Sequence, residues 1–295
     1  MRVFVTGATG FIGGVVVPEL IQAGHQVLGL ARSDEGARAL SALGAEVHRG
    51  TLEDLASLRS GAADADGVIH AGFIHDFAKF AQNCEIDRRA IEAIGEVLSG
   101  SARPLVVTAG IPGIPGRITT EADDLPTAHP MPRVSEQTAL ALAARDVHAS
   151  VVRLPQVHDR DKAGIVTYLI ATAQHKGVSA YVGDGQNRWS AVHRFDVAPL
   201  YRLALEKGAV GARYHAIAEE GVALKDIAEA IGRGMKVPVV SITQEQAASH
   251  FGPLGFFAGM SNPGSSTLTQ RQLGWAPGAH PGLIDDIVNA NVFAG

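Results

Sequence analysis

The sequence is poor in several residues on which whole classes of protein depend. It has a single cysteine, Cys84, so neither an internal disulfide nor a cysteine-rich zinc site can form. The 25 lysines and arginines are outnumbered by 30 aspartates and glutamates, which leaves no broad basic surface for a nucleic acid. The 12 histidines are dispersed and form no His-Glu-x-x-His motif, so we expect no metal site.

Long apolar segments are missing as well. No uninterrupted run approaches the roughly 20 residues that a membrane-spanning helix needs. The N-terminal stretch MRVFVTGATG leads directly into an apolar strand and glycines, without the charged and apolar regions of a secretion signal. Together with the single cysteine, these absences predict a cytoplasmic protein that does not insert into a membrane.

Glycine, by contrast, is abundant: it supplies 34 of the 295 residues, against a usual share of about 7%. Three of these glycines, Gly7, Gly10 and Gly13, follow the first apolar run with the spacing G-x-x-G-x-x-G. The first permits a tight turn, the second lets the backbone approach a pyrophosphate, and the third lets helix and strand pack closely. Because a helix N-terminus favours an anion, this turn predicts a dinucleotide site.

The first two thirds of the chain alternate short β-branched runs with longer periodic segments, a pattern typical of a parallel sheet. We expect strands at residues 3–6, 26–31, 46–48, 67–70, 105–108 and 150–153. Helices should begin near Phe11, Asp34, Leu52, Ala81 and Val134, and Pro18 should kink or loosen the first of them.

This pattern predicts an α/β protein with a Rossmann-type, doubly wound parallel sheet and a smaller C-terminal substrate-binding lobe. Residues 1–155 are expected to form the nucleotide-binding domain, which a returning segment near 190–217 completes. Residues 156–295 are expected to form mainly the smaller lobe.

The connection from 109 to 133 carries five prolines, which exclude a regular helix or a central strand. It leaves the carboxyl end of the 105–108 strand, where open α/β sheets bind their ligands. We therefore expect this loop to serve the substrate. The alternative is an inserted surface loop without a role.

The end of the second predicted strand decides between NAD and NADP. An acidic residue about 20 positions beyond the glycines would accept hydrogen bonds from the ribose 2′-hydroxyl of NAD. The chain has Arg32 there, whose guanidinium can pair with a 2′-phosphate, and Ser33 can add a donor. We therefore expect NADP in preference to NAD. The alternative is a solvated arginine, with Asp34 capping the next helix.

Five segments carry a recognisable pattern: TGATGFIGG, GVIHAGF at 67–73, LVVTAG at 105–110, VVRLPQVHD at 151–159 and AVHRFDVA at 191–198. They resemble the extended short-chain dehydrogenase/reductases, in particular their NAD-dependent epimerase/dehydratase-like members. The resemblance covers nearly the whole chain and implies an NAD(P) enzyme. It implies that the cofactor is lined by Ala71, Gly72 and Phe73, that Thr108 borders the nicotinamide, and that its amide is flanked by Pro155, Gln156 and Val157. The other expected cofactor contacts are Thr9, Phe11, Ile12, Thr51 and Leu52.

One part of the family's pattern is missing. Family members normally use a tyrosine and a lysine four residues later on one helical face, assisted by a serine. Here the first tyrosine is Tyr168, and no lysine lies between positions 79 and 162. Aligning SEQTAL with the usual segment puts Pro132 at the tyrosine position and Glu136 at the lysine position, and the assisting serine maps to Ala109.

Another group must therefore supply the proton. His75 is one candidate, because imidazole titrates near neutral pH, although it could equally belong to a polar loop in which Asp76 caps a helix. Ser135 and Glu136 begin the helix that normally carries the catalytic pair, where the alternative is simple capping. Thr108 is a retained donor at a strand end, where a β-branched residue also suits the strand. Arg133 could bind a substrate carboxylate or a surface acid.

The leading hypothesis is an NADP(H)-dependent oxidoreductase that reduces a small, mostly apolar ketone, imine or related compound. Six aromatic residues could wall the pocket for this small molecule: Phe73, Phe77, Phe80, Trp189, Phe256 and Phe257. A second hypothesis is an NADP-binding sensor or interaction protein without turnover. A third is an epimerase or dehydratase.

The protein is also expected to form a homodimer. Helices near 81–98 and 134–148 resemble those through which family members pair, and the second, VSEQTALALAARDVH, is rich in alanine. The alternative is that this alanine-rich face packs only within one chain.

Overall fold

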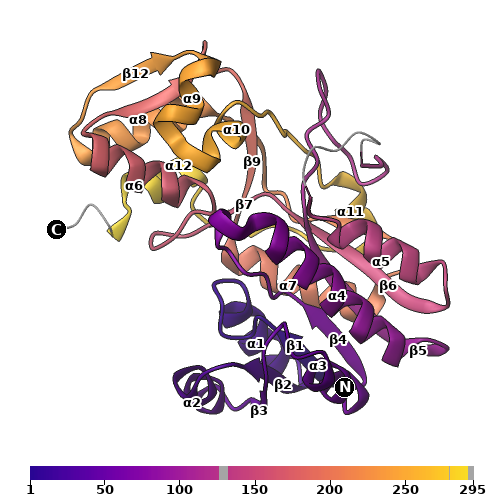
Figure 1. Ribbon diagram of the computed structural model, residues 1–295. Helices are drawn as coiled ribbons and strands as arrows, with labels where there is room; N and C mark the ends of the chain where they lie inside the picture. The colour runs from indigo at the N-terminus through magenta and orange to yellow at the C-terminus, as the bar shows by residue number, and fades with distance from the viewer. Residues whose placement is uncertain (126–131, 279, 292–295) are drawn as a thin grey trace.

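A parallel sheet forms the centre of the larger lobe in the computed structural model, which describes residues 1–125, 132–278 and 280–291 (Figure 1). Its seven strands pair in the order β10-β6-β5-β4-β1-β2-β3, and every pair is parallel. They are β1 (Arg2–Thr6), β2 (Gln26–Ala31), β3 (Glu46–Arg49), β4 (Gly67–His70), β5 (Ser101–Gly110), β6 (Val147–Leu154) and β10 (Arg213–His215). The strand order reverses beside β1, which confirms the doubly wound fold and predicts ligand binding at the carboxyl ends there.

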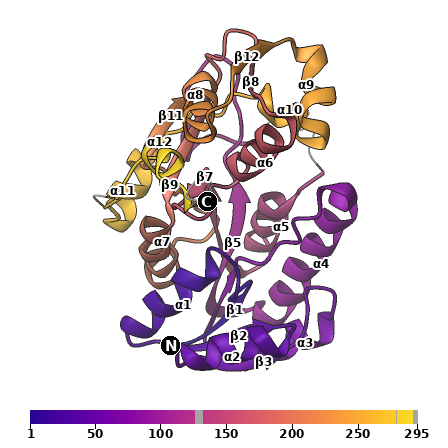
Figure 2. The ribbon, with the colours of Figure 1, turned by 90° about the vertical axis from the view of Figure 1, so that its left-hand side faces the viewer.

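Helices cover both faces of this sheet, as Figure 2 shows. Helices α1 (Gly13–Gln22) and α7 (Arg194–Lys207) lie on one face, while α3 (Leu55–Ala63), α4 (Phe80–Leu98) and α5 (Ser135–Ala143) lie on the other. Alternate strand residues enter the two cores, so Val3 and Val5 pack towards α1 and Phe4 packs towards α3. The same alternation decides which functional side chains can meet.

Helix boundaries follow local capping. Helix α2 (Asp34–Ala42) begins where expected, with its N-terminus capped by Ser33. Helix α3 begins three residues later than predicted, because the Asp54 side chain accepts the Ser57 N–H and starts the helix at Leu55. Helix α1 continues through Pro18 to Gln22, so the proline does not end it.

Strand β5 is longer than predicted and begins at Ser101. It accommodates Pro104 because its pairing register with β6 shifts between Ser101 and Pro104, which relieves the proline of a ladder hydrogen bond. At its other end the strand extends to Gly110, which shortens the loop expected from residue 109.

The alanine-rich helix α5 packs closely on α4 within the chain. A Cβ atom added at Gly95 of α4 would lie 2.5 Å from a methyl carbon of Leu142 on α5. The homodimer remains a prediction that this packing leaves open.

The smaller lobe follows β6 along the chain and lies at the top of Figure 1. It holds the three-stranded sheet β11-β9-β7 and the pair β12-β8. Its strands are β7 (Gln156–His158), β8 (Ser179–Val182), β9 (Arg188–His193), β11 (Glu219–Ala223) and β12 (Val239–Ile242). Its helices include α6 (Val166–Lys176), α8 (Leu224–Met235), α9 (Gln244–Phe251), α10 (Gly255–Ala258) and α12 (Leu283–Val288), while α11 (Thr267–Leu273) packs on α7 and β10 of the large sheet. Between β9 and β11 the chain returns to the large sheet through α7 and β10.

No helix within the described ranges is long and apolar enough to cross a membrane.

A buried polar pair joins α12 to β7. The His158 Nδ1 and Asp286 Oδ2 atoms lie 2.7 Å apart, and both side chains are about 1% exposed. The His193 ring, at the start of α7, stacks on His280 with 4.6 Å between ring centroids. These contacts hold the C-terminal segment against β7 and the end of β9.

We expect Asp286→Asn to lower the free energy of unfolding by about 2 kcal/mol, because it replaces a charge-assisted hydrogen bond to buried His158 with a weaker one. Urea unfolding followed by circular dichroism measures the change. Asp285→Asn, at the exposed neighbouring position, is the matched control and should change stability by less than about 0.5 kcal/mol. Equal effects of the two substitutions would contradict a structural role for the pair.

Candidate functional site

The glycine turn after β1 has the shape that a dinucleotide requires. Gly7 has a φ of +67°, and a Cβ there would lie 2.7 Å from the Ala71 carbonyl oxygen. A Cβ at Gly13 would lie 2.1 Å from the Gly7 carbonyl oxygen, so only glycine lets α1 approach the turn. At Gly10 the nearest atom is again the Gly7 oxygen, at 3.1 Å, and the rest of the space is open. The turn therefore fits a pyrophosphate above Gly10.

Other predicted cofactor contacts surround this turn. Thr9 and Thr51 are exposed, while Leu52 lies against Gly72, where an added Cβ would meet the leucine methyl at 3.1 Å. Gln156 and Val157 are buried, and the Gln156 Oε1 accepts the Ile165 N–H at 2.9 Å. The side chain of Gln156 is therefore engaged within the protein.

Two cations beside the turn were missed by sequence reasoning. The Arg194 guanidinium lies 4.8 Å from the centroid of the Phe11 ring, and the Lys162 ammonium lies 5.7 Å from it. Arg194 is held by Asp159, whose Oδ2 accepts from its Nη1 at 2.9 Å. Phe11 belongs to the glycine turn, so these two cations, one at the start of α7 and one on the loop after β7, stand next to the predicted pyrophosphate position. Arg194 lies inside the family-like segment AVHRFDVA, which was the available signal.

At the end of β2, Arg32 is exposed and makes no ion pair with any described residue. Ser33 caps α2 by accepting the Gly36 N–H at 3.2 Å. The nearest acid, Asp34, is paired with Arg49 from β3. The alternative in which Asp34 caps the helix is therefore not what the structure shows.

A chain of buried polar groups crosses the carboxyl ends of β1 and β4. The His70 Nδ1 lies 2.9 Å from the Thr6 hydroxyl, and the His70 Nε2 lies 3.1 Å from the Asp87 Oδ1. The Ser135 hydroxyl donates to the other oxygen of Asp87. Burial opposes ionisation of Asp87, yet the hydrogen bonds and charges of its partners hold the pKa of this carboxyl below its ordinary value. Sequence reasoning missed both His70 and Asp87.

Arg133 extends this series of polar contacts towards the carboxyl end of β5. Its Nε donates to the Ser135 hydroxyl at 2.9 Å, and one Nη donates to the Thr108 carbonyl oxygen at 3.1 Å. The guanidinium lies 4.2 Å from the centroid of the Phe73 ring and 4.0 Å from an Asp87 oxygen. An arginine has five N–H donors, and among the described residues only Ser135 and the Thr108 carbonyl accept hydrogen bonds from Arg133.

Thr108 points the other way. Its hydroxyl donates to the His70 carbonyl oxygen at 2.9 Å and lies 2.5 Å from the Tyr201 hydroxyl of α7. Burial raises the pKa of Tyr201, so the phenol stays protonated. Because strand side chains alternate, Thr108 faces α7 and Ala109 faces α5. These contacts revise the expected catalytic role of Thr108 to a structural one.

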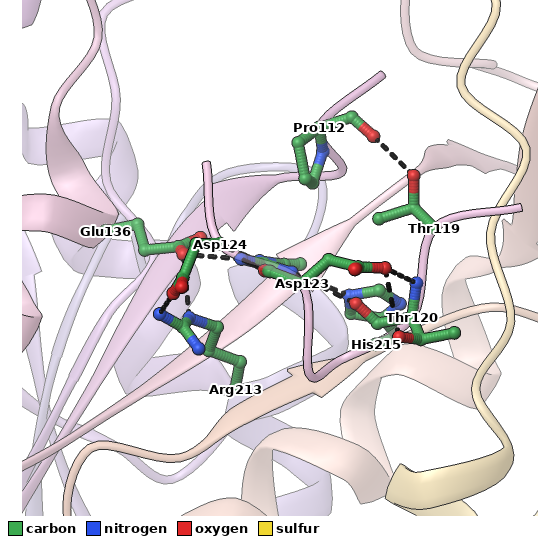
Figure 3. A network of polar contacts seen from close by, with 9 residues as sticks. Pro112, Thr119, Thr120, Asp123, Asp124, Glu136, Arg213 and His215 are labelled. Carbon is green, nitrogen blue, oxygen red and sulfur yellow. Dashed lines mark hydrogen bonds and ion pairs between the residues drawn. The ribbon is translucent and has the colours of Figure 1, made fainter. Parts of the chain in front are cut away.

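Glu136 is also engaged elsewhere. It is 2% exposed, and its two oxygens accept from Arg153 Nε and Nη2, while Arg213 Nε lies 3.0 Å from one of them. Figure 3 shows this network reaching Asp124 and His215, and Arg153 also donates to the Asp123 carbonyl oxygen. The Glu136 carboxylate is buried and is bound by two guanidiniums, those of Arg153 and Arg213. This corrects the expectation that Glu136 acts as acid or base.

His75 lies on the loop after β4 and is exposed. Its ring stands 5.2 Å from the Phe73 ring, centroid to centroid. Partial burial, followed by the charges of Arg133 and Lys162, lowers the pKa of His75 below its usual 6.5. Asp76 caps the short helix η1 (Phe77–Lys79), as the alternative expectation had it, but His75 takes no part in that cap.

Of the four predicted catalytic residues, the structure brings two together through Phe73 and Arg133. His75 contacts the Phe73 ring, Arg133 lies on that ring, and Ser135 bonds to Arg133. Ser135 is 2% exposed and has both Asp87 and Arg133 as partners, so it positions the arginine.

The comparisons with known proteins agree with this nucleotide-binding architecture. The chain matches the NAD dependent epimerase/dehydratase family over residues 3–217. It is 48% identical to an uncharacterised protein of Schizosaccharomyces pombe, over 99% of this chain and 100% of that protein. It is 27% identical to the 4-hydroxy-2-methyl-3-oxo-4-farnesyl-3,4-dihydroquinoline-1-oxide ketoreductase of Stigmatella aurantiaca, over 85% of this chain and 80% of that protein.

Among solved structures, a double mutant of the dTDP-glucose 4,6-dehydratase DesIV of Streptomyces venezuelae, with NAD bound, has the same fold. The TM-score is 0.77 at 16% identity, covering 99% of this chain and 96% of that one. The fold and turn thus define a nucleotide-cofactor enzyme of the oxidoreductase or epimerase type. The chain belongs to the NAD dependent epimerase/dehydratase family, which confirms the resemblance seen in its motifs.

Gly13→Ala should weaken binding of the nucleotide cofactor, titrated as NADPH and as NADH, about tenfold or more and lower stability, because its Cβ would collide with the Gly7 carbonyl oxygen and push α1 away from the turn. Calorimetric titration and thermal unfolding measure the two effects. Gly14→Ala is the control, since nothing lies within 4 Å of its added Cβ. If both variants bound the cofactor like the unaltered protein, the turn would not be the pyrophosphate site.

Proposed function

We propose that this protein is an NADPH-dependent reductase of a carbonyl or imine group, in which Arg133 takes over the electrostatic task of the family's missing tyrosine and lysine. The observation that carries the proposal is the placement of Arg133. Its guanidinium is fixed by Ser135, Thr108 and the Phe73 ring, one residue after the position where the tyrosine would stand. The S. aurantiaca relative, whose name describes a ketoreductase, is consistent with this reaction class.

When bound, the reduced nicotinamide supplies a hydride. The remaining donors of Arg133 hold the acceptor's oxygen or nitrogen and stabilise the negative charge that develops on it. Ser135 and Asp87 keep the guanidinium in place, so little reorganisation is needed as that charge appears. Phe73, on which Arg133 lies, helps to exclude water from the reacting atoms.

Arg133 does not give up a proton, because a guanidinium stays charged at all physiological pH values. The His75 ring contacts the same Phe73 ring on which the Arg133 guanidinium lies. We assign the proton transfer to the imidazolium of His75. The histidine donates directly or through one water to the anion that Arg133 stabilises.

NADP is the proposed cofactor because Arg32 stands at the end of β2, where an acid would bind the ribose of NAD. Of the two acids that open α2, Asp34 and Glu35, Asp34 is already paired with Arg49. A 2′-phosphate would meet the Arg32 guanidinium and the positive end of α2.

We expect Arg133→Met to lower kcat/KM about 100-fold or more on any ketone or imine that the unaltered protein reduces, since it removes the group that stabilises the anion. NADPH oxidation across a panel of such compounds provides the assay. Absence of turnover over a broad panel, combined with tight NADPH binding, would overturn the reductase and favour an NADP-binding sensor.

The pH profile tests His75. Because the acid must be protonated, kcat/KM should fall about tenfold per pH unit above a pKa that lies below 6.5. His75→Gln should remove this descending limb. Enzyme-free decay of NADPH in acid is subtracted at each pH. An unchanged limb in the variant would assign the proton to another group.

Arg32→Asp should weaken NADPH binding about 10- to 100-fold while leaving NADH binding within a factor of about three, because only NADPH carries the 2′-phosphate. Fluorescence titration with both cofactors measures the preference. Arg271→Asp, an exposed position on α11, makes the same charge change away from the cleft and should alter neither affinity. Tighter binding of NADH by the unaltered protein would contradict the assignment.

A further inference from the structure

A groove of about 540 Å³ opens between the two lobes. One wall is the loop of His75, Asp76 and Phe77, and the opposite wall comes from α6 and from the turn between α9 and α10. Figure 2 shows the amino end of α4, which follows this loop, facing the lobe that holds α6 and α9. None of the family-like motifs covers the residues of α6 or α9.

The inner end of the groove is next to the proposed reaction centre. His75 lines the groove, its ring contacts Phe73, and Phe73 carries Arg133 on its face. A molecule whose reacting group is bound by Arg133 can therefore extend past His75 into the groove.

Phe77 and Tyr168 line the groove, and further aromatic rings pack around Phe77 behind its wall. Phe77 contacts Tyr168 edge-on at 5.3 Å between centroids, stacks with Phe80 at 5.8 Å, and approaches Phe257 at 6.5 Å. Phe73 joins the same cluster through Phe80 at 6.0 Å. Five of the six aromatic residues expected to wall a pocket thus gather here, since Phe256 contacts Phe257. The sixth, Trp189, is buried in the smaller lobe, where its indole N–H donates to the Met260 carbonyl oxygen.

The outer end of the groove is cationic. Lys176 stands at the end of α6, where its ammonium donates to the Ser249 carbonyl oxygen at 3.0 Å, and it forms no ion pair with any described residue. His250 lies beside it, and its Nε2 is shielded from solvent with no hydrogen-bond partner in the described part of the chain. Asp76 is the only carboxylate among the lining residues, and it is used to cap η1.

We infer that the groove binds the body of an aromatic or polycyclic substrate that carries an anionic group, a carboxylate or sulfonate, at the end remote from the reacting carbonyl or imine. Phe77 and Tyr168 contact the rings of the substrate, and the Lys176 ammonium binds its anion. The orientation of this substrate rests on the proposed reductase function, but the binding of an anionic aromatic molecule does not.

The test uses two fluorescent probes with the same rings. 1-Anilinonaphthalene-8-sulfonate carries an anion, and N-phenyl-1-naphthylamine is its neutral counterpart. Both are titrated in saturating NADP⁺, which is not fluorescent and blocks the nucleotide turn. We expect the sulfonate to bind the unaltered protein about tenfold more tightly than the neutral probe.

Three variants locate the binding. Lys176→Met should weaken the sulfonate about tenfold and leave the neutral probe within a factor of about two. Tyr168→Ala should weaken both probes, because it removes a ring from the wall. Lys207→Met, at the far end of α7, should change neither. Displacement of the sulfonate by NADP⁺, equal affinities for the two probes, or an unchanged sulfonate affinity in Lys176→Met would each overturn the inference.

A kinetic measurement separates this inference from the proposed function. For an aryl ketone acid and its methyl ester, Lys176→Met should raise KM for the acid alone and leave kcat unchanged. If no ketone is reduced while the probes behave as expected, the groove assignment stands and the reductase fails. If reduction occurs but Lys176→Met affects acid and ester alike, the reductase stands and the groove assignment fails.

Discussion

The carboxylate of Asp87 is the constraint on which the site depends. A charge that is 1% exposed is costly to bury unless its oxygens are paired. Here one oxygen meets His70 of β4 and the other meets Ser135 of α5, with Arg133 nearby. Because these partners come from two segments far apart in the sequence, satisfying one buried charge fixes the carboxyl end of β4 against the start of α5 and the arginine that precedes it.

In the proposed reductase, the same edge replaces the family's usual pair. The position of the expected lysine holds Glu136, and a buried carboxylate there requires cations, which Arg153 of β6 and Arg213 of β10 provide. The positive charges at this position are therefore carried by β6 and β10, and α5 carries the negative one. Arg133, two residues before α5, supplies a cation in place of the missing lysine. The exchange keeps a positive charge near the reacting atoms and leaves the proton to a separate group.

Sequence reasoning predicted the features that depend on local patterns. The alternation of apolar runs placed the strands, and the spacing of Gly7, Gly10 and Gly13 predicted a turn whose geometry tolerates no side chain at two of the three positions. The polar chain could not be found that way, because His70 and Ser135 reach Asp87 from 17 and 48 positions away. Local propensity also says nothing about which face of β5 presents Thr108. That depends on the register of the strand, which directs the hydroxyl to Tyr201.

In the proposed reductase, Phe73 connects the reaction chemistry to the recognition of the substrate. One face of its ring carries the Arg133 guanidinium, and its edge contacts continue through Phe80 to Phe77 and the groove. An aromatic ring under a guanidinium stabilises the cation without consuming its N–H donors, unlike a carboxylate partner in direct contact. Asp87 stays 4.0 Å away and acts mainly through Ser135, so Arg133 retains donors for an acceptor. The ring thereby does two things at once: it supports a charge for catalysis and begins the apolar path along which a substrate would extend.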